Sequence, residues 1–247
     1  MNTDKTWRWY GDNDPYYGVL TDDAFRGGNL TSEHKAAFFE SGQKHITQLL
    51  SELEAAQFSV GRIKALDFGC GVGRLVIPLA RDFESVVGID VSEGMLKECA
   101  KNASEMGLQN IRLVLSNDQL SALEDEKFDL VHSFIVLQHI PYERGLDIFR
   151  RLLDLVKPGG VACLHVQYAG FPLVQGFGLK TALRRMLNKL RDKLIPPEQM
   201  LMNAYPLNAV FGLLDRQGFS NCRVVFTRTT RGGVFIWAQR GNQPAIF

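Results

Sequence analysis

Apolar residues along the chain gather in short blocks that alternate with segments of helical spacing. Before the alternation begins, an amphipathic pattern starts at Thr31 or Ser32, either of which can cap a helix, and runs to about Gln57. The blocks expected to be strands lie at residues 63–68, 85–89, 111–115, 128–134 and 161–166. The segments with helical spacing lie at 74–82, 93–106 and 143–156. Strands that alternate with helices predict a doubly wound, mainly parallel α/β sheet.

The last part of the chain has a different pattern. A helix at 207–217 ends before Gly218, which can cap it, and two strands follow at 222–227 and 234–239. Residues 228–233 alone join these strands, and so short a connection requires an antiparallel pair. We therefore predict a Rossmann-like sheet of seven strands that ends in an antiparallel hairpin.

Two regions lie outside this alternation and are expected to act as cap elements. The first, residues 1–58, begins with irregular, aromatic-rich sequence that includes Trp7 and Trp9 and continues into the first helix. The second is an insertion at 168–206. The prediction is an N-terminal cap or lid segment, 1–58, followed by an α/β domain, 59–247, that contains this insertion.

Charge and cysteine content narrow the setting in which the protein works. The chain has 28 Lys and Arg against 27 Asp and Glu, a formal net charge of +1, so nothing draws it as a whole to nucleic acid or a membrane. The four cysteines lie far apart, which is typical of thiols in a reducing cytoplasm rather than of a zinc site or a disulfide frame. The start lacks the pattern of a signal peptide, and no apolar stretch approaches the roughly 18–20 residues of a membrane span. We expect a cytoplasmic protein without a metal site.

A glycine-rich turn at residues 67–73 (Asp-Phe-Gly-Cys-Gly-Val-Gly) lies at a junction of strand and helix. Glycines at such a junction let the backbone turn tightly and approach a ligand closely. Asp90 ends the next predicted strand, where a carboxylate can accept hydrogen bonds from both hydroxyls of a ribose. The pair indicates a site for a nucleoside-containing ligand.

The spacing of this turn separates two classes of nucleoside cofactor. The dinucleotide pattern G-x-G-x-x-G would place its third small residue where this chain has Arg74. Asp67 puts a carboxylate just before the turn, which disfavours a pyrophosphate and favours an ammonium group. The methionine part of S-adenosylmethionine carries such a group. The residues therefore favour S-adenosylmethionine over a nicotinamide or flavin cofactor.

The order of motifs resembles that of the class I S-adenosylmethionine-dependent methyltransferases over about residues 60–166. Residues 66–73 are similar to the first motif of that family, 128–134 to its fourth strand and 155–160 to the turn before its fifth. The resemblance implies that residues 59–247 form a methyltransferase domain with S-adenosylmethionine as cofactor. The cofactor-binding residues that it implies are Asp67, Gly69, Gly71, Gly73, Asp90, Val91, Met95, Asn117, Asp118, Gln119 and Phe134.

The end of the fourth strand carries the candidate chemistry. Methyl transfer needs mainly an aligned acceptor and donor, and a base helps where the acceptor is a hydroxyl. His139 is the predicted general base, because the ordinary pKa of histidine suits proton transfer near neutrality. The alternative is a purely structural His139 that packs or bonds to the backbone. Gln138 is expected to contact the acceptor or the cofactor.

The cap elements are expected to choose the acceptor. Tyr16 and Tyr17 from the N-terminal segment, with Asn203 and Tyr205 from the insertion, are predicted to line the acceptor site. Aromatic rings beside Asp and Asn suit a sugar, although such rings also hold a chain end against a core. Residues 179–194 form an apolar stripe with a basic opposite face, which is typical of a lid and also of a helix that meets a membrane surface or an anionic acceptor.

The function expected from these features is metal-independent O-methylation of a small molecule or glycan. The stretch 137–141 (Leu-Gln-His-Ile-Pro) and the N-terminal segment resemble methyltransferases of bacterial sugar and cell-surface polysaccharide pathways. The alternatives are N- or C-methylation of a metabolite, protein or RNA, and a non-catalytic S-adenosylmethionine-binding protein. A nucleic-acid partner is not expected, and the sequence leaves the oligomeric state and the acceptor atom open.

Overall fold

The computed structural model describes residues 3–169, 200–227 and 232–242 of the 247-residue chain. The basic amphipathic stretch 179–194 lies outside the described residues, and so does its expected contact with a membrane surface or an anionic acceptor.

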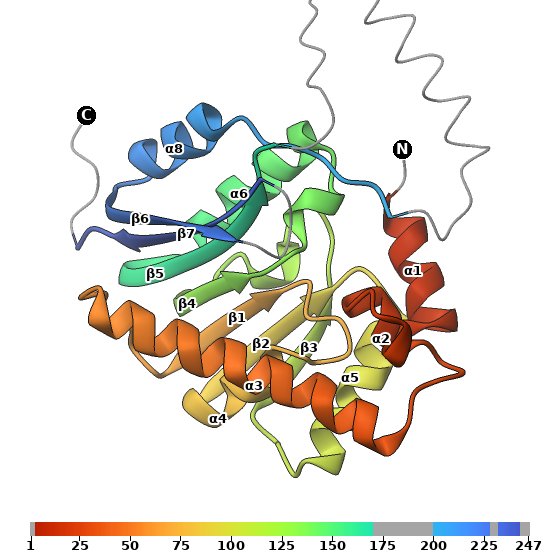
Figure 1. Ribbon diagram of the computed structural model, residues 1–247. Coiled ribbons are helices and arrows are strands. Elements are labelled where there is room, and N and C mark those ends of the chain that lie inside the picture. The colour runs from red at the N-terminus through yellow and green to blue at the C-terminus, as the bar shows by residue number, and fades with distance from the viewer. Residues whose placement is uncertain (1–2, 170–199, 228–231, 243–247) are drawn as a thin grey trace, which may run out of the picture.

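The described residues form one mixed sheet of seven strands. These are β1 Lys64–Phe68, β2 Ser85–Asp90, β3 Ile111–Leu115, β4 Phe128–Ser133, β5 Val156–Gln167, β6 Phe219–Thr227 and β7 Gly233–Arg240. Their order is β3-β2-β1-β4-β5-β7-β6 (Figure 1). The strands from β3 to β5 are parallel to their neighbours, whereas β7 runs antiparallel to both β5 and β6. The predicted Rossmann-like sheet with its closing antiparallel pair is confirmed.

Helices cover both faces of this sheet, as a doubly wound fold requires (Figure 1). One face carries α3 (Ser32–Ala55), α4 (Val76–Asp82) and α5 (Glu93–Glu105). The other carries α6 (Tyr142–Asp154) and α8 (Leu207–Arg216). The two apolar cores form because side chains alternate along a strand. In β1, Ala65 packs with Ile46 of α3, and the next residue, Leu66, packs with Phe149 of α6.

The first thirty residues differ from the irregular structure that we expected. They form α1 (Thr3–Asn13), α2 (Pro15–Val19) and a short 3₁₀ helix, η1 (Asp23–Phe25). Local propensity predicts no helix there, because Trp, Tyr and Gly are moderate or poor helix formers. Tertiary packing overrides it: Tyr10 and Tyr16 join a buried cluster with Phe38 of α3 and Met95 of α5.

The arrangement of the strands fixes where a ligand site can lie. The chain runs outward from β1 to β2 and β3 and then crosses back to β4 on the other side of β1. Ligands of open α/β sheets bind at the carboxyl ends of the strands beside such a reversal. The predicted glycine turn follows β1, and the predicted His139 lies just beyond β4, in the short 3₁₀ helix η3 (Leu137–His139).

Candidate functional site

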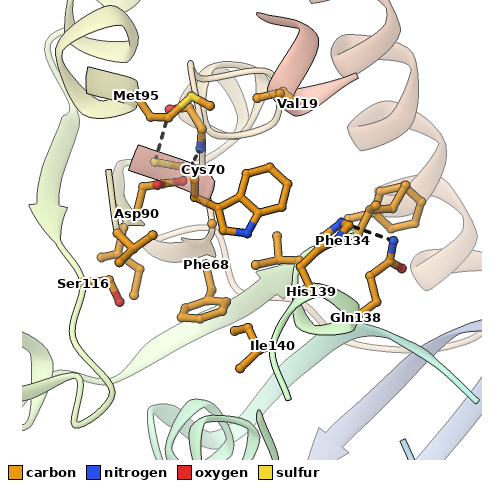
Figure 2. A pocket seen from close by; sticks show the side chains of 18 of the residues that line it. Val19, Phe68, Cys70, Asp90, Met95, Ser116, Phe134, Gln138, His139 and Ile140 are labelled. Carbon is orange, nitrogen blue, oxygen red and sulfur yellow. Dashed lines mark hydrogen bonds between the residues drawn. The ribbon is translucent and has the colours of Figure 1, made fainter. Parts of the chain in front are cut away.

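A cavity of about 1350 Å³ opens at the carboxyl ends of β1, β2 and β4. Its walls come from the sheet, from the N-terminal helices and from residues 200 and 202. Single-ligand pockets are commonly about 300–1,000 Å³, so this cavity has room for more than one small molecule. Figure 2 shows Cys70, Asp90 and Met95 on one side of it and Gln138 and His139 on the other.

The structure brings most of the predicted residues to this cavity. Those that line it are Asp67, Gly69, Gly71, Asp90, Val91, Met95, Asn117, Asp118, Phe134, Gln138 and His139. The predicted residues that are not part of its lining are Gly73, Gln119, Tyr16, Tyr17, Asn203 and Tyr205.

The glycine turn has the backbone conformation that its composition predicts. Gly69, Gly71 and Gly73 have φ of +76°, +53° and +101°, in the region that L side chains rarely adopt. A Cβ at Gly71 would lie 2.5 Å from Val19 Cγ2 of α2, so a side chain there would also displace the cap. Gly73 instead faces Ile77 and Cys99, where it permits close packing behind the turn.

Asp90 holds the turn and still presents acceptor capacity to the cavity. Its two oxygens accept hydrogen bonds from Gly71 N (3.0 Å) and Ser92 N (2.9 Å). A carboxylate has about four lone-pair sites, so each oxygen can accept one bond more, as two ribose hydroxyls would require. Burial raises the pKa of the Asp90 carboxyl to about 6, although backbone N–H groups oppose this shift.

Asp67 lies under the turn as a buried carboxylate. It accepts a hydrogen bond from Nδ1 of the fully buried His132 at 2.8 Å. Arg74, also buried, lines the same part of the cavity, and burial lowers the pKa of its guanidinium to about 10. The carboxylate therefore has a defined orientation beside the glycines, which suits the ammonium group of an amino acid.

The loop after β3 supplies an ion pair that the sequence did not indicate. Arg144 of α6 makes a bidentate contact with Asp118 (2.8 and 2.6 Å) and a second one with Asp4 of α1 (2.8 and 3.1 Å). Asp118 thus faces Arg144 as well as the cavity, and Gln119 is exposed. The Arg144 guanidinium joins the N-terminal cap to the loop in which we expected contacts with adenine.

His139 is held in one orientation by the backbone. Its ring is 7% exposed, and Nδ1 lies 2.9 Å from the carbonyl oxygen of Leu201. Because a carbonyl only accepts, Nδ1 carries the proton and Nε2 carries the lone pair. Gln138 Nε2 approaches that lone pair at 3.5 Å, a long contact. Burial lowers the pKa of the His139 ring to about 4, so the ring is neutral at pH 7.

Four predicted acceptor-binding residues, which do not line the cavity, make contacts within the protein. The Tyr16 hydroxyl contacts Glu98 (2.7 Å) and Asn102 (2.9 Å) beneath the cap, and Tyr205 donates to backbone carbonyls in the core at 2.7 Å and 3.0 Å. Tyr17 stacks on Arg26, and Asn203 bonds to the Gln138 carbonyl. The hydroxyl of Tyr16 thus attaches the cap to α5, and the polar groups of Asn203 and Tyr205 attach the segment 200–206 to the residues after β4.

Other residues take the places expected of those four. Trp7 of α1 lines the cavity with its ring 4.8 Å from the His139 ring in an edge-to-face contact, and Met200 and Met202 also line it. The aromatic content of the first residues was a signal for Trp7. Nothing local to Arg144 signals its contact with Asp4, because 140 positions separate the two.

Ile135 adds a strained backbone at the cavity. It lines the cavity between β4 and His139 and has φ of +61°. A β-branched residue in the left-handed region is a conformational outlier, and such strain gathers at functional sites.

The described residues contain no group of three or more His, Cys, Asp or Glu side chains placed to hold a metal ion. None of the described helices is long and apolar enough to cross a membrane.

Comparison with known proteins agrees with this geometry. Residues 65–160 match a family of methyltransferase domains. A stretch of 100 residues is 34% identical to an aklanonic acid methyltransferase of Streptomyces, covering 39% of this chain and 44% of that protein. Another of 99 residues is 36% identical to the ubiquinone biosynthesis O-methyltransferase of Ruegeria pomeroyi, covering 40% and 39%. The chain thus matches about two fifths of the length of these relatives.

Similar solved structures extend the likeness to nearly the whole fold. Magnesium protoporphyrin IX methyltransferase from Synechocystis, crystallised with SAH, has a TM-score of 0.60 at 22% identity and covers 95% of this chain and 98% of that one. A methyltransferase from Clostridium acetobutylicum has a TM-score of 0.57 at 16% identity and covers 82% and 92%. Residues 65–160 therefore match a methyltransferase domain, and the chain as a whole has the fold of these methyltransferase structures.

Proposed function

We propose that this protein transfers a methyl group from S-adenosylmethionine to an oxygen of a small-molecule or glycan acceptor, without a metal ion. One observation carries the proposal: a single cavity has the open glycine turn with Asp90 on one side and the neutral ring of His139 on the other (Figure 2). The relatives include enzymes named as O-methyltransferases, which supports oxygen as the acceptor atom.

The residues on the glycine side fit S-adenosylmethionine by their chemistry. Asp90 has acceptor capacity for ribose hydroxyls, and Asp67 offers a carboxylate for an ammonium group. A Cβ would lie 2.5 Å from Val136 at Gly69 and 2.5 Å from Val19 at Gly71, so the turn requires glycine at both positions. When bound, S-adenosylmethionine supplies an electrophilic methyl group on a sulfonium.

His139 has the protonation state that a base requires. Its Nδ1–H donates to the Leu201 carbonyl, so Nε2 is free to take the proton of an acceptor hydroxyl. The contact from Gln138 at 3.5 Å is long enough for an acceptor to replace it. A positioned base of this kind contributes typically 10²–10⁴-fold to a rate.

The N-terminal cap, 1–58, is proposed to close the cavity. Val19 covers Gly71, Trp7 contacts His139, and Asp4 is bound to Arg144, so three points of the cap reach the site. Closure of this kind excludes water and positions the acceptor. The insertion 168–206 contributes Met200 and Met202 to the same cavity.

The setting of the reaction is part of the proposal. The near-zero net charge supports an acceptor other than nucleic acid, and four free cysteines support a reducing, cytoplasmic location. N- or C-methylation and non-catalytic binding of S-adenosylmethionine are the competing functions.

Calorimetry followed by a methyl-transfer assay tests the proposal. Titration with S-adenosylhomocysteine (SAH) should give saturable binding at one site per chain, and absence of binding would refute the cofactor assignment. Labelled S-adenosylmethionine is then supplied with hydroxyl, amine and carbon acceptors. Transfer to a hydroxyl that persists in EDTA supports metal-independent O-methylation. Binding without transfer to any acceptor favours the non-catalytic alternative, and transfer to nitrogen or carbon favours the other.

A further inference from the structure

The side of the cavity around His139 has a lining of its own, which we call the acceptor wall. It consists of Trp7, Phe134, Gln138, His139, Met200 and Met202. The Trp7 ring contacts the His139 ring, and the sulfur of Met202 lies 3.6 Å from Gln138 Nε2. Trp7 therefore packs against the base and Met202 against its neighbour Gln138, and Phe134 and Met200 add an aromatic and a thioether side chain to the lining of the same cavity.

The acceptor wall offers few polar atoms to a ligand. The Gln138 side chain is buried, and its amide nitrogen faces Met202 and His139. Its amide oxygen is buried as well and points away from the His139 ring (Figure 2). Nδ1 of His139 is taken by Leu201. Of the polar atoms of Gln138 and His139, this leaves His139 Nε2 to meet a ligand.

This lining suits a flat apolar molecule better than a sugar. A sugar brings several hydroxyls, and each hydroxyl that loses water without a new partner costs free energy. Aromatic rings pack favourably against Trp and Phe, and methionine adapts its shape to flat surfaces with favourable sulfur contacts.

On this basis, we propose that the acceptor is a hydroxylated aromatic molecule that packs between Trp7 and the methionines and presents a phenolic hydroxyl to His139 Nε2. This inference rests on the proposed O-methyltransferase function and narrows its acceptor class. The cavity volume of about 1350 Å³ leaves space beside a nucleoside cofactor for more than one ring.

The proton transfer agrees with a phenol. The phenolic oxygen forms a bond to the methyl carbon as the carbon–sulfur bond breaks, and the electron pair of that bond stays on sulfur. The hydroxyl proton moves to His139 Nε2 and later leaves to solvent. Because the pKa of the His139 ring is lowered to about 4, the ring is a weak base. A phenol, with a pKa of about 10, gives up its proton to such a base far more readily than an alcohol, whose pKa is near the roughly 15.7 of water.

A binding and turnover experiment tests the acceptor class. The SAH complex is titrated with catechol, 2,3-dihydroxynaphthalene and 1,2-dihydroxyanthraquinone, with UDP-glucose as the sugar counterpart. We expect at least one aromatic to bind and to be methylated, with a kcat/KM at least tenfold above that of UDP-glucose. Failure of all three aromatics to bind an intact SAH complex, or preferential methylation of UDP-glucose, would overturn the proposal. Failure of SAH itself to bind would instead refute the proposed function.

A matched pair of tryptophan variants locates the site. Trp7→Ala should raise the Kd of the bound aromatic about tenfold, since an aromatic pair contributes about 0.5–1.5 kcal/mol beyond area burial. Trp7→Phe should restore most of the affinity. Trp9 lies two residues along the same helix and outside the cavity lining. Trp9→Ala should therefore change the Kd of the aromatic less than twofold. Equal effects of Trp7→Ala and Trp9→Ala would place the aromatic elsewhere and contradict the inference.

Discussion

The two sides of the cavity are built in different ways. The cofactor side comes mainly from one contiguous part of the chain, residues 67–118, and its Asp90 carboxylate is held by the backbone N–H groups of Gly71 and Ser92. The acceptor side joins Trp7, the segment after β4 and residues 200–202, which lie far apart in sequence. A local motif therefore defines the first side, whereas tertiary packing defines the second. We expect changes on one side to leave the other side's ligand largely unaffected.

Loss of the base should give the largest effect, and it should be confined to turnover. His139→Asn keeps a side-chain N–H for the Leu201 carbonyl and removes Nε2. The expected result is a fall in kcat of about 10²–10⁴-fold. The Kd of SAH should stay within twofold, as measured by calorimetry.

The pH profile separates the base from a structural histidine. Wild-type kcat should fall as the pH drops through about 4–5, where the ring with its lowered pKa becomes protonated. An Asn variant with unchanged kcat would show that His139 only positions the segment 200–202.

Removal of the ribose acceptor should affect binding of the cofactor most. Asp90→Ala removes a carboxylate that we expect to accept hydrogen bonds from two ribose hydroxyls. The same carboxylate also accepts hydrogen bonds from the backbone N–H groups of Gly71 and Ser92. Hydrogen bonds to a charged group are each worth about 1.5–3 kcal/mol, so the Kd of SAH should rise about 100-fold. The affinity for an aromatic acceptor, measured without cofactor, should change little. The division between the two sides would be contradicted if both affinities fell equally.

Three buried histidines and Asp90 change stability with pH in opposite directions. The pKa of His45 is lowered to about 2, and those of His139 and His165 to about 4, mainly by burial. Below pH 6.5 the unfolded chain binds protons that the folded chain rejects, so each histidine lowers the free energy of unfolding by about 1.4 kcal/mol per pH unit. Asp90 has the opposite effect. Its pKa is raised to about 6 in the folded chain, so the folded chain binds this proton at a higher pH than the unfolded chain, and stability rises as the pH falls.

Denaturant titrations at pH 6.5 and pH 5 measure this balance. We expect a net loss of about 2–4 kcal/mol at the lower pH, because three histidines outweigh one carboxyl. His45→Leu should reduce that loss, and His34→Asn, at the exposed start of α3, is the matched control. Equal stability at the two pH values would argue against neutral histidines at these three buried positions.

Arg144 connects the two sides and allows a test of their coupling. Arg144→Gln breaks both bidentate contacts and so removes the link that Arg144 makes between Asp4 of α1 and Asp118. The contacts are partly exposed, so the loss of stability should be about 1–2 kcal/mol. Hydrogen exchange in α1 should accelerate, and acceptor KM should rise several-fold. Arg150→Gln removes an exposed ion pair with Asp154 on the same helix. This control should leave the hydrogen exchange of α1 and the acceptor KM unchanged.

The smallest expected effect concerns the backbone between β4 and His139. Ile135 has φ of +61°, which glycine adopts without strain and alanine does not. Ile135→Gly and Ile135→Ala both remove the side chain, so their difference isolates the backbone. The Gly variant should be more stable by about 1 kcal/mol in thermal unfolding. A more stable Ala variant would show that this conformation is not maintained.

The cofactor side could be predicted from the sequence because its determinants are local. Glycine spacing after a strand, with an acidic residue at the end of the next, specifies Gly69, Gly71 and Asp90 without knowledge of the rest. Short apolar blocks that alternate with helical spacing similarly predicted the sheet, and the short connection at residues 228–233 predicted its closing antiparallel pair.

The acceptor side could be predicted only in part: Gln138 and His139 follow the fourth predicted strand, whereas the other contacts on this side are distant in sequence. Tyr16 and Tyr205 looked like ligands by composition, yet their hydroxyls bond inside the protein. The helix that carries Trp7 has weak propensity and depends on packing against α5. The contact of Arg144 with Asp4 and the strained Ile135 depend on the completed fold and leave no local pattern.

A crystal structure of the complex with SAH and a hydroxylated aromatic tests the central claim most directly. We predict the ribose of SAH on Asp90, its amino-acid part beside Asp67 and the glycine turn, and its sulfur directed toward His139. The aromatic hydroxyl should lie within hydrogen-bond distance, about 3 Å, of His139 Nε2. SAH bound away from Asp90, or an acceptor that does not touch the side of the cavity formed by Trp7 and His139, would contradict the account.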